Sequence, residues 1–196
     1  QRRGKAGVGL LAAPDNDDSG RLVAGHYDSA DNLPDMAAAV SIITHIDHEG
    51  RDRLLAAFYD RCKGDSLVVD KWLALNALSS LPGAAGRVAG LMKIELFSLN
   101  NPNRVRALAG SFALLNPTGF HAIDGAGYAL IADTVIALDP INPQVAARTL
   151  GAFRNWRMME PKRRAMAEKE LRRVAGREDL SRDTGEIARR SLGSES

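Results

Sequence analysis

The chain has 196 residues, enough for one domain with a sizeable core or for one part of a larger domain. Its 45% hydrophobic and 26% charged residues are typical of a globular protein, and a net charge of +2 gives no overall field that favours nucleic acid. No apolar run reaches the roughly 18 residues of a transmembrane helix. The single cysteine, Cys62, excludes an intrachain disulfide and favours a cytoplasmic location.

The N-terminal part of the chain carries weaker helix signals than the rest. No signal peptide is visible, and because the chain begins with Gln1 rather than Met we expect a fragment or a processed product. Residues 1–13 contain three glycines, each costing about 1 kcal/mol in a helix interior, which is typical of a damaged or cut helix. The segment from Pro14 to Gly20, PDNDDSG, predicts a polar break.

From residue 33 onward, apolar residues recur with helical spacing. The residues Val105, Leu108, Phe112 and Leu115, for example, follow 3-4-3 spacing and line one face of a helix. No useful segment alternates with period two, so we expect no sheet. Turn residues between the stripes predict helices over 33–48, 51–62, 66–80, 84–94, 102–115, 125–138, 142–154 and 160–175.

One local pattern occurs twice. Asn101-Pro102 and Asn142-Pro143 each place a capping asparagine before a proline at the first helical position. The copies lie roughly 40 residues apart, the length of a two-helix solenoid repeat. The predicted fold is therefore all-α, a superhelical stack of antiparallel helix pairs, which is an α-solenoid of ARM/HEAT type.

Each Asn-Pro pair is followed by an arginine, Arg106 or Arg148. Arg148 falls beside Val145 and Thr149 on the helical wheel, so we expect it on the inward side of its helix, where arginine needs a partner. One interpretation is that each arginine pairs with a carboxylate between hairpins. The other is that both face one concavity and bind an anion such as a peptide carboxylate.

Catalytic motifs are largely absent. The chain has no H-E-x-x-H, G-x-S-x-G or G-x-x-x-x-G-K-[ST]. His45 and His48 in HIDHE stand one turn apart but lack a third ligand, so a helix-terminal histidine is favoured over a metal site. For His121, beside Asp124, a structural hydrogen bond in a loop is favoured over catalysis.

The C-terminal part is rich in both signs of charge. From Arg154 onward, arginines and lysines alternate with Glu160, Glu168 and Glu170, which favours a solvated helix face over a nucleic-acid surface. Residues 193–196 are expected to form a frayed tail.

Two blocks carry a family resemblance: VVDKWLALNA, and FSLNNPNRVRALAGSFALLNPTGFHAIDGAGYALIADTVIALDPINPQVAARTL. They resemble the C-terminal helical domain of bacterial aminopeptidase N, a zinc metallopeptidase of the gluzincin, alanyl-aminopeptidase type. The match runs from about Leu33 to Leu192 and is strongest from Asp70 to Arg148. Residues 1–32 match poorly, and we expect them to form N-terminal helices that are a truncated part of the same domain. The C-terminal helical-repeat domain is expected at 33–192.

The resemblance implies a non-catalytic role for this chain. In the family, zinc is bound in a separate catalytic domain, and the superhelix covers the active site and encloses a cavity. Arg106 and Arg148 match family arginines that point toward that cavity, and Tyr128 is assigned to packing. We therefore expect that this chain contains no catalytic residue, metal or cofactor. We expect it to pack against the catalytic domain and to contact the peptide substrate. Neither nucleic acid nor a membrane is an expected partner.

Two alternatives remain at the level of sequence. The chain could be a free-standing helical-repeat scaffold that binds a peptide or protein on its concave face. More remotely, its basic C-terminal helices could bind nucleic acid, which would show as a steep salt dependence.

Overall fold

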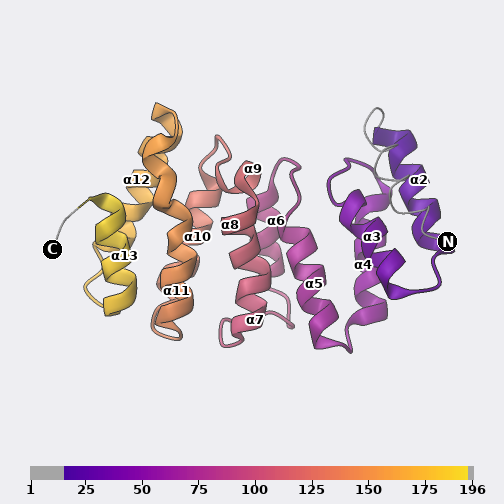
Figure 1. Cartoon of the computed structure of the whole chain (residues 1–196), viewed down its shortest axis with the longest axis horizontal. Coiled ribbons are helices and arrows are strands. Elements are labelled where there is room, and N and C mark those ends of the chain that lie inside the picture. Colours follow the sequence, from indigo (N-terminus) through magenta and orange to yellow (C-terminus); the bar gives the residue numbers. More distant parts are fainter. Residues whose placement is uncertain (1–15, 194–196) are drawn as a thin grey trace. The chain divides into compact units, whose positions relative to one another are not determined.

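The computed structural model describes residues 16–193, which form helices joined by short turns and contain no strand (Figure 1). The prediction of an all-α fold is thus confirmed. The chain divides into two compact units, residues 1–81 and residues 82–196. The expected truncated helix at residues 1–13 and the frayed tail at residues 194–196 lie outside the described residues. The expected division near residue 32 stays a prediction.

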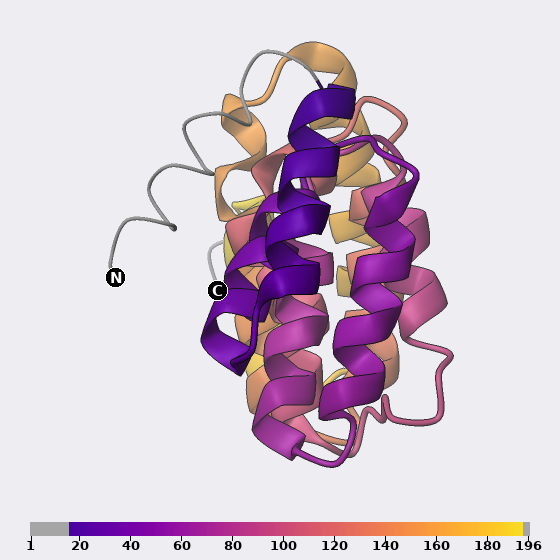
Figure 2. The same ribbon diagram turned by 90° about the vertical axis from the view of Figure 1, so that its right-hand side faces the viewer.

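The first unit contains four described helices, which run side by side (Figure 2). Helix α2 packs on α3 and α4, α3 packs on α4, and α4 packs on α5. Their shared core includes Val40, Ile43, Leu54, Phe58 and Leu73, all nearly inaccessible to solvent. The bounds are α2 Asn16–Ser29, α3 Leu33–Ile43, α4 Gly50–Cys62 and α5 Ser66–Ala77.

The predicted break from Pro14 to Gly20 is wrong over its described part, since α2 already begins at Asn16. Asp17 and Asp18 lie in the first turn, where negative charge is favourable. Both carboxylates also contact Arg21, at 2.6 and 2.8 Å. The acidic run thus starts a helix rather than interrupting one.

The second unit arranges its helices in two layers (Figure 1). One layer contains α6, α10 and α12, and the other contains the continuous helix α7–η1–α8 followed by α11 and α13. The first layer spans Ala84–Leu91, Ala126–Leu138 and Pro161–Ala175. The second spans Pro102–Val105, Arg106–Gly110, Ser111–Leu115, Pro143–Leu150 and Arg182–Leu192. A short helix α9, Pro117–Phe120, and a 3₁₀ segment η2, Gly151–Met158, join the layers.

Hydrogen bonds within this unit repeat at a fixed sequence spacing. Thr134 contacts Met92, Arg163 donates to His121, and Ser181 donates to Asp139, and in each pair the residues are 42 positions apart. The hydroxyl of Thr184 donates to the carbonyl of Pro143, 41 positions away. This spacing confirms the repeat of roughly 40 residues expected from the two Asn-Pro pairs.

An aromatic cluster forms the centre of the unit. Phe120 contacts Phe112, Tyr128 and Phe153 in edge-to-face geometry, with ring centroids 6.5, 5.1 and 5.2 Å apart. All four side chains are fully buried. The expectation that Tyr128 serves packing agrees with this position, and the cluster fixes the turn that precedes α10.

Candidate functional site

The first arginine follows a capped helix start. The side chain of Asn101 accepts hydrogen bonds from the backbone N–H groups of Asn103 and Arg104, which confirms the predicted cap. After one α-helical turn, Arg106–Gly110 forms a π-helical turn, and the Ser111 hydroxyl bonds the Arg106 carbonyl at 3.5 Å. Such widened turns frequently mark functional sites.

The second arginine occupies the equivalent place one repeat later. Asn142 accepts a hydrogen bond from the backbone N–H of Val145, as predicted, and Pro143 begins α11. Arg148, 42 positions after Arg106, lies in the last turn of α11. It is exposed rather than inward as expected, because its long side chain extends past the buried Val145 and Thr149 to the surface.

Arg106 and Arg148 line the same cavity, of about 200 Å³, which also includes Ser111, Leu114 and Thr149. Arg106 donates one hydrogen bond to the side chain of Asn103, at 3.2 Å. Among residues 16–193, no ion pair involves either guanidinium. The structure thus brings the two predicted residues together and offers them no internal carboxylate. Whether they lie on a concave side of the whole repeat stack stays a prediction.

A second cavity adjoins the first. It has a volume of about 400 Å³ and shares Leu114 and Leu115 with the arginine cavity. It is also lined by His121, Arg154 and Asn155. Sequence reasoning missed Arg154, which was assigned to a solvated charged face. In the structure, Arg154 lies on η2, directly after α11, and lines this cavity.

His121 is held by its neighbours. Its Nδ1 lies 2.8 Å from the Tyr128 hydroxyl, and Arg163 donates to its carbonyl at 2.6 Å. Burial lowers the pKa of His121, and the Arg163 guanidinium lowers it further. Burial raises the pKa of Tyr128, so its hydroxyl stays protonated. The structural role is confirmed, but the partner is Tyr128, while Asp124 accepts a hydrogen bond from Ala126.

His45 and His48 do not converge on a common point. The Nδ1 of His45 lies 3.1 Å from the Ser80 hydroxyl, and burial lowers the pKa of this ring. The Nδ1 of His48 accepts from the Gly50 N–H at 2.9 Å, while its Nε2 lies 3.5 Å from Asp17. Over the described part of the chain, no group of three potential ligands is close enough to hold a metal ion.

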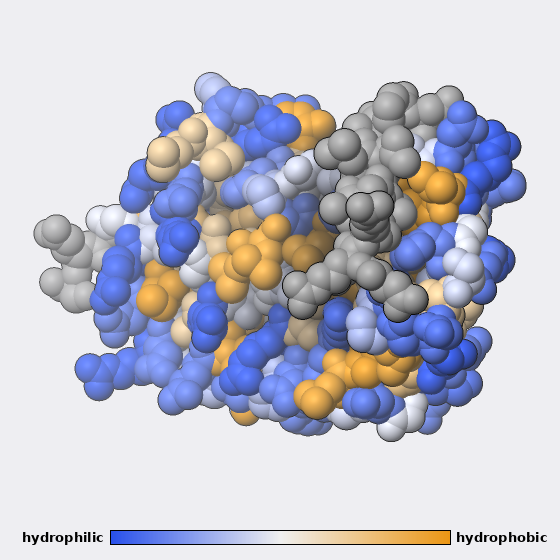
Figure 3. Space-filling view, turned by 45° about the vertical axis from the view of Figure 1, so that its right-hand side comes forward, coloured by the Kyte–Doolittle hydropathy of each residue, from blue (hydrophilic) through white to orange (hydrophobic). Residues whose placement is uncertain are grey.

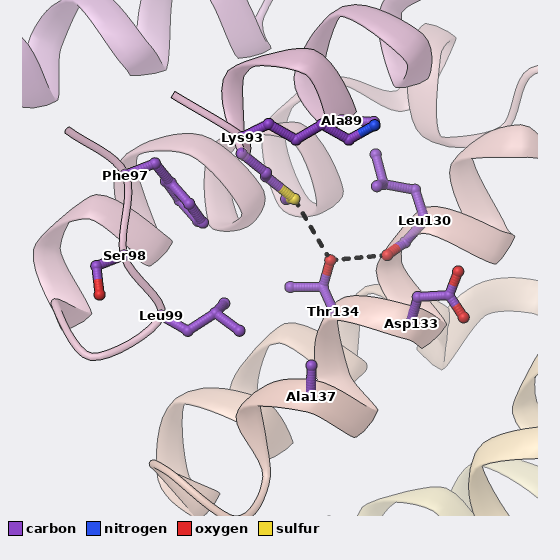
Figure 4. A pocket seen from close by; sticks show the side chains of 10 residues that line it. Ala89, Lys93, Phe97, Ser98, Leu99, Leu130, Asp133, Thr134 and Ala137 are labelled. Atoms are coloured by element: carbon purple, nitrogen blue, oxygen red, sulfur yellow. Dashed lines mark hydrogen bonds between the residues drawn. The ribbon is translucent and has the colours of Figure 1, made fainter. Parts of the chain in front are cut away.

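A third cavity, of about 360 Å³, lies between α6 and α10 (Figure 4). Its wall is mainly apolar, and its lining includes the charged Lys93 and Asp133 and the polar Thr134. The Thr134 hydroxyl donates to the Leu130 carbonyl at 2.7 Å and contacts the Met92 sulfur at 3.8 Å. Asp133 pairs with Arg173 at 2.7 Å. This cavity therefore contains one cation without an ion pair among the described residues, Lys93, whereas the arginine cavity contains two.

The surface gives no sign of a membrane-spanning segment. On the face shown in Figure 3, hydrophilic residues dominate and apolar residues form separate patches. No described helix is long and apolar enough to cross a membrane. On α12, Arg172 pairs with Glu168, which agrees with the prediction of a solvated charged face. The prediction is wrong for Glu170, because this residue is only 8% exposed and its carboxylate pairs with Arg173.

Two layers of helices with a 42-residue period define an ARM-type helical-repeat protein. Residues 4–193 match the model of a family described as "Domain of unknown function (DUF3458_C) ARM repeats", and the chain belongs to this family.

The similar proteins are aminopeptidases, which confirms the resemblance noted in the sequence. Aminopeptidase N of Caulobacter vibrioides is 34% identical over 94% of this chain, and that of Haemophilus influenzae is 38% identical over 87%. The chain spans only 21% and 20% of their lengths. A crystal structure of Legionella pneumophila aminopeptidase A in complex with aspartic acid superposes with a TM-score of 0.88 at 32% identity, covering 97% of this chain and 22% of that one. The chain is thus homologous to one domain of these peptidases.

The family resemblance implies a zinc ion in a separate catalytic domain, and the described residues of this chain do not fit a zinc site. The only histidines that stand close in sequence, His45 and His48, direct their Nδ1 atoms to different partners. A catalytic zinc needs three protein ligands around one point. His45 and His48 are therefore not a zinc site.

Proposed function

We propose that this chain is the C-terminal helical-repeat domain of a zinc aminopeptidase and forms part of the wall of its substrate cavity. The similarity to a fifth of the length of two aminopeptidases N supports the assignment of the domain. The observation that carries the proposed role is the shared cavity of Arg106 and Arg148. We also propose a cytoplasmic location, because the chain has only one cysteine.

In this proposal, the two arginines bind the carboxyl end of a peptide whose amino end lies in the catalytic domain. A guanidinium is always charged and offers paired N–H donors that match a carboxylate. Two of them around one cavity of about 200 Å³ can bind a single carboxylate from two sides. Zinc, when bound in the catalytic domain, supplies the activated water. The residues of this chain bind and orient the peptide, so their loss should raise KM more than it lowers kcat.

The test uses the full-length peptidase that contains this chain, with a tetra-alanine peptide as free acid and as amide. The variants Arg106→Ala and Arg148→Ala should raise KM for the acid by about 10- to 100-fold, as expected for a charge-assisted contact of about 1.5–3 kcal/mol. The KM for the amide should change little. Arg190→Ala is the matched control, because Arg190 lies 42 positions beyond Arg148 and pairs with Glu186 at 2.5 Å.

Three results would contradict the proposal. Equal effects on the acid and the amide would show that the arginines do not meet the carboxylate. A strong loss of thermal stability in either variant would assign them a structural role. Peptide binding by a protein whose gene encodes no zinc-binding motif would favour the free-standing scaffold instead.

A further inference from the structure

The two adjoining cavities form one groove lined by three arginines, and we propose that this groove selects peptides with an acidic residue near their carboxyl end. This inference rests on the proposed function and names the substrate class of the same site. Arg106 and Arg148 bind the terminal carboxylate, and Arg154 binds the side chain of an aspartate or glutamate upstream of it.

The groove is continuous at two leucines. Leu114 and Leu115 end α8 and line both cavities. They are 44% and 65% exposed, although large apolar side chains are usually buried. An apolar surface next to arginines fits a peptide, because the side chains of a peptide can be apolar at one position and acidic at another. It fits a nucleic acid less well, because a nucleic acid carries a negative charge at every phosphate.

The charge of the groove is entirely positive. Among the described residues, neither cavity is lined by an aspartate or a glutamate. The other titratable group in the lining is His121, and burial together with Arg163 lowers its pKa, so it is uncharged near neutral pH. Arg154 is therefore the cation of the second cavity among the described residues that line it.

Elsewhere in the same unit, some arginines have carboxylate partners, while Arg182 and Arg189 have none among the described residues. Arg163, Arg172, Arg177 and Arg190 each lie within 3.4 Å of an acidic side chain. Arg154, like Arg148, forms no ion pair or hydrogen bond with any residue in the described range 16–193. A cation that lines a cavity and lacks an internal partner is available to an external anion.

The spacing of the arginines sets the position of the acidic residue. Arg148 and Arg154 are six residues apart along α11 and η2, which corresponds to about 9–12 Å at a helical rise of 1.5–2.0 Å per residue. An extended peptide advances about 3.3–3.6 Å per residue. The preferred acidic residue should therefore lie about three positions before the carboxyl terminus.

The experiment measures kcat/KM of the full-length peptidase on six-residue alanine peptides in which one aspartate, or asparagine as its neutral isostere, is moved through the last five positions. We expect aspartate to be favoured by roughly 3- to 10-fold at about the third position before the terminus, the range for a solvent-exposed charge pair of about 1 kcal/mol. Arg154→Gln should abolish this preference. Arg157→Gln is the matched control, since Arg157 lies on the same 3₁₀ segment but stacks on Trp156, 4.9 Å from the ring centroid.

The outcomes separate this inference from the proposed function. If the enzyme distinguishes free acid from amide through Arg106 and Arg148 but shows no aspartate preference, the inference is wrong and the proposed function stands. An aspartate preference that survives in Arg154→Gln also overturns it. If the enzyme favours neither the free acid over the amide nor aspartate over asparagine, the proposed function is wrong, and the inference that rests on it is wrong as well. Loss of the preference in Arg154→Gln but not in Arg157→Gln supports the inference.

Discussion

The buried carboxylate of Asp139 accepts two hydrogen bonds from Ser181, one from its backbone N–H at 2.7 Å and one from its hydroxyl at 2.6 Å. Asp139 follows the last residue of α10, and Ser181 is the N-cap of α13. One side chain that is only 2% exposed thus connects the end of one helix to the start of another, 42 residues away.

Replacing Asp139 by asparagine should therefore destabilise the second unit. The amide loses one acceptor oxygen and the charge that strengthens both bonds, so we expect the free energy of unfolding to fall by about 1.5–3 kcal/mol. Urea unfolding measures the loss, and hydrogen exchange should accelerate first in Arg182–Leu192. Asp183→Asn, an exposed acidic residue in the first turn of the same helix, is the control and should change little. Equal losses in both variants would contradict this account.

Gly127 should tolerate no side chain. A Cβ added there would lie 2.4 Å from the carbonyl oxygen of Phe120 and 2.8 Å from that of Gly119, and backbone cannot move aside cheaply. Gly127→Ala should reduce the free energy of unfolding by about 1–3 kcal/mol, as overpacking does. At Gly90, within α6, an added Cβ meets nothing within 4 Å. Gly90→Ala should instead be neutral or stabilise by up to about 1 kcal/mol. Thermal denaturation that ranks the two variants in the opposite order would refute the prediction.

The caps should each contribute measurably to stability. Asn142→Ala removes the acceptor for the N–H of Val145 and should cost about 1 kcal/mol. Asn142→Asp keeps an oxygen in the same place and should retain nearly all of the stability. Chemical denaturation of the wild type and the two variants measures the free energies of unfolding. Similar losses in both variants would show that the side chain of Asn142 does not stabilise the helix by accepting this hydrogen bond.

Stability should decrease in mild acid because of two histidines. Burial lowers the pKa of both His121 and His45 below the ordinary value of 6.5. The unfolded chain therefore binds more protons, and the contribution of each ring is complete above 6.5 and is lost as pH falls through its folded pKa. The free energy of unfolding should drop from about pH 7 to about pH 5. His121→Gln and His45→Gln should each flatten this slope, and an unchanged slope in both would contradict the prediction.

The sequence was sufficient for the fold because an α-solenoid is built from local interactions. Asparagine caps, prolines at first helical positions and 3.6-residue stripes act within a few residues, so the predicted helices near 102–115, 125–138 and 142–154 appear close to their expected places. The boundaries failed where helical geometry changes: the predicted helix over 33–48 ends at Ile43, and that over 142–154 becomes 3₁₀ after Leu150.

The site was only partly visible in the sequence. Arg106 and Arg148 could be selected, because equivalent residues in adjacent repeats lie side by side. Arg154 could not, since its position depends on the change from α to 3₁₀ geometry at Gly151. The apolar part of the site was not predicted either, since Leu115 was expected on the stripe of Val105, Leu108 and Phe112 but is 65% exposed.

The 42-residue period has a consequence for how such a protein can gain or lose an anion site. The same register holds Arg106, Arg148 and Arg190, and these differ in the residue about one helical turn before them: Asn103, Gln144 and Glu186. Glutamate neutralises its arginine, asparagine holds it by a single hydrogen bond, and glutamine leaves the charge unopposed. The repeat thus places an arginine at the same position every 42 residues, and the polar residue three or four positions before it determines whether that arginine is paired within the chain or remains available to a ligand.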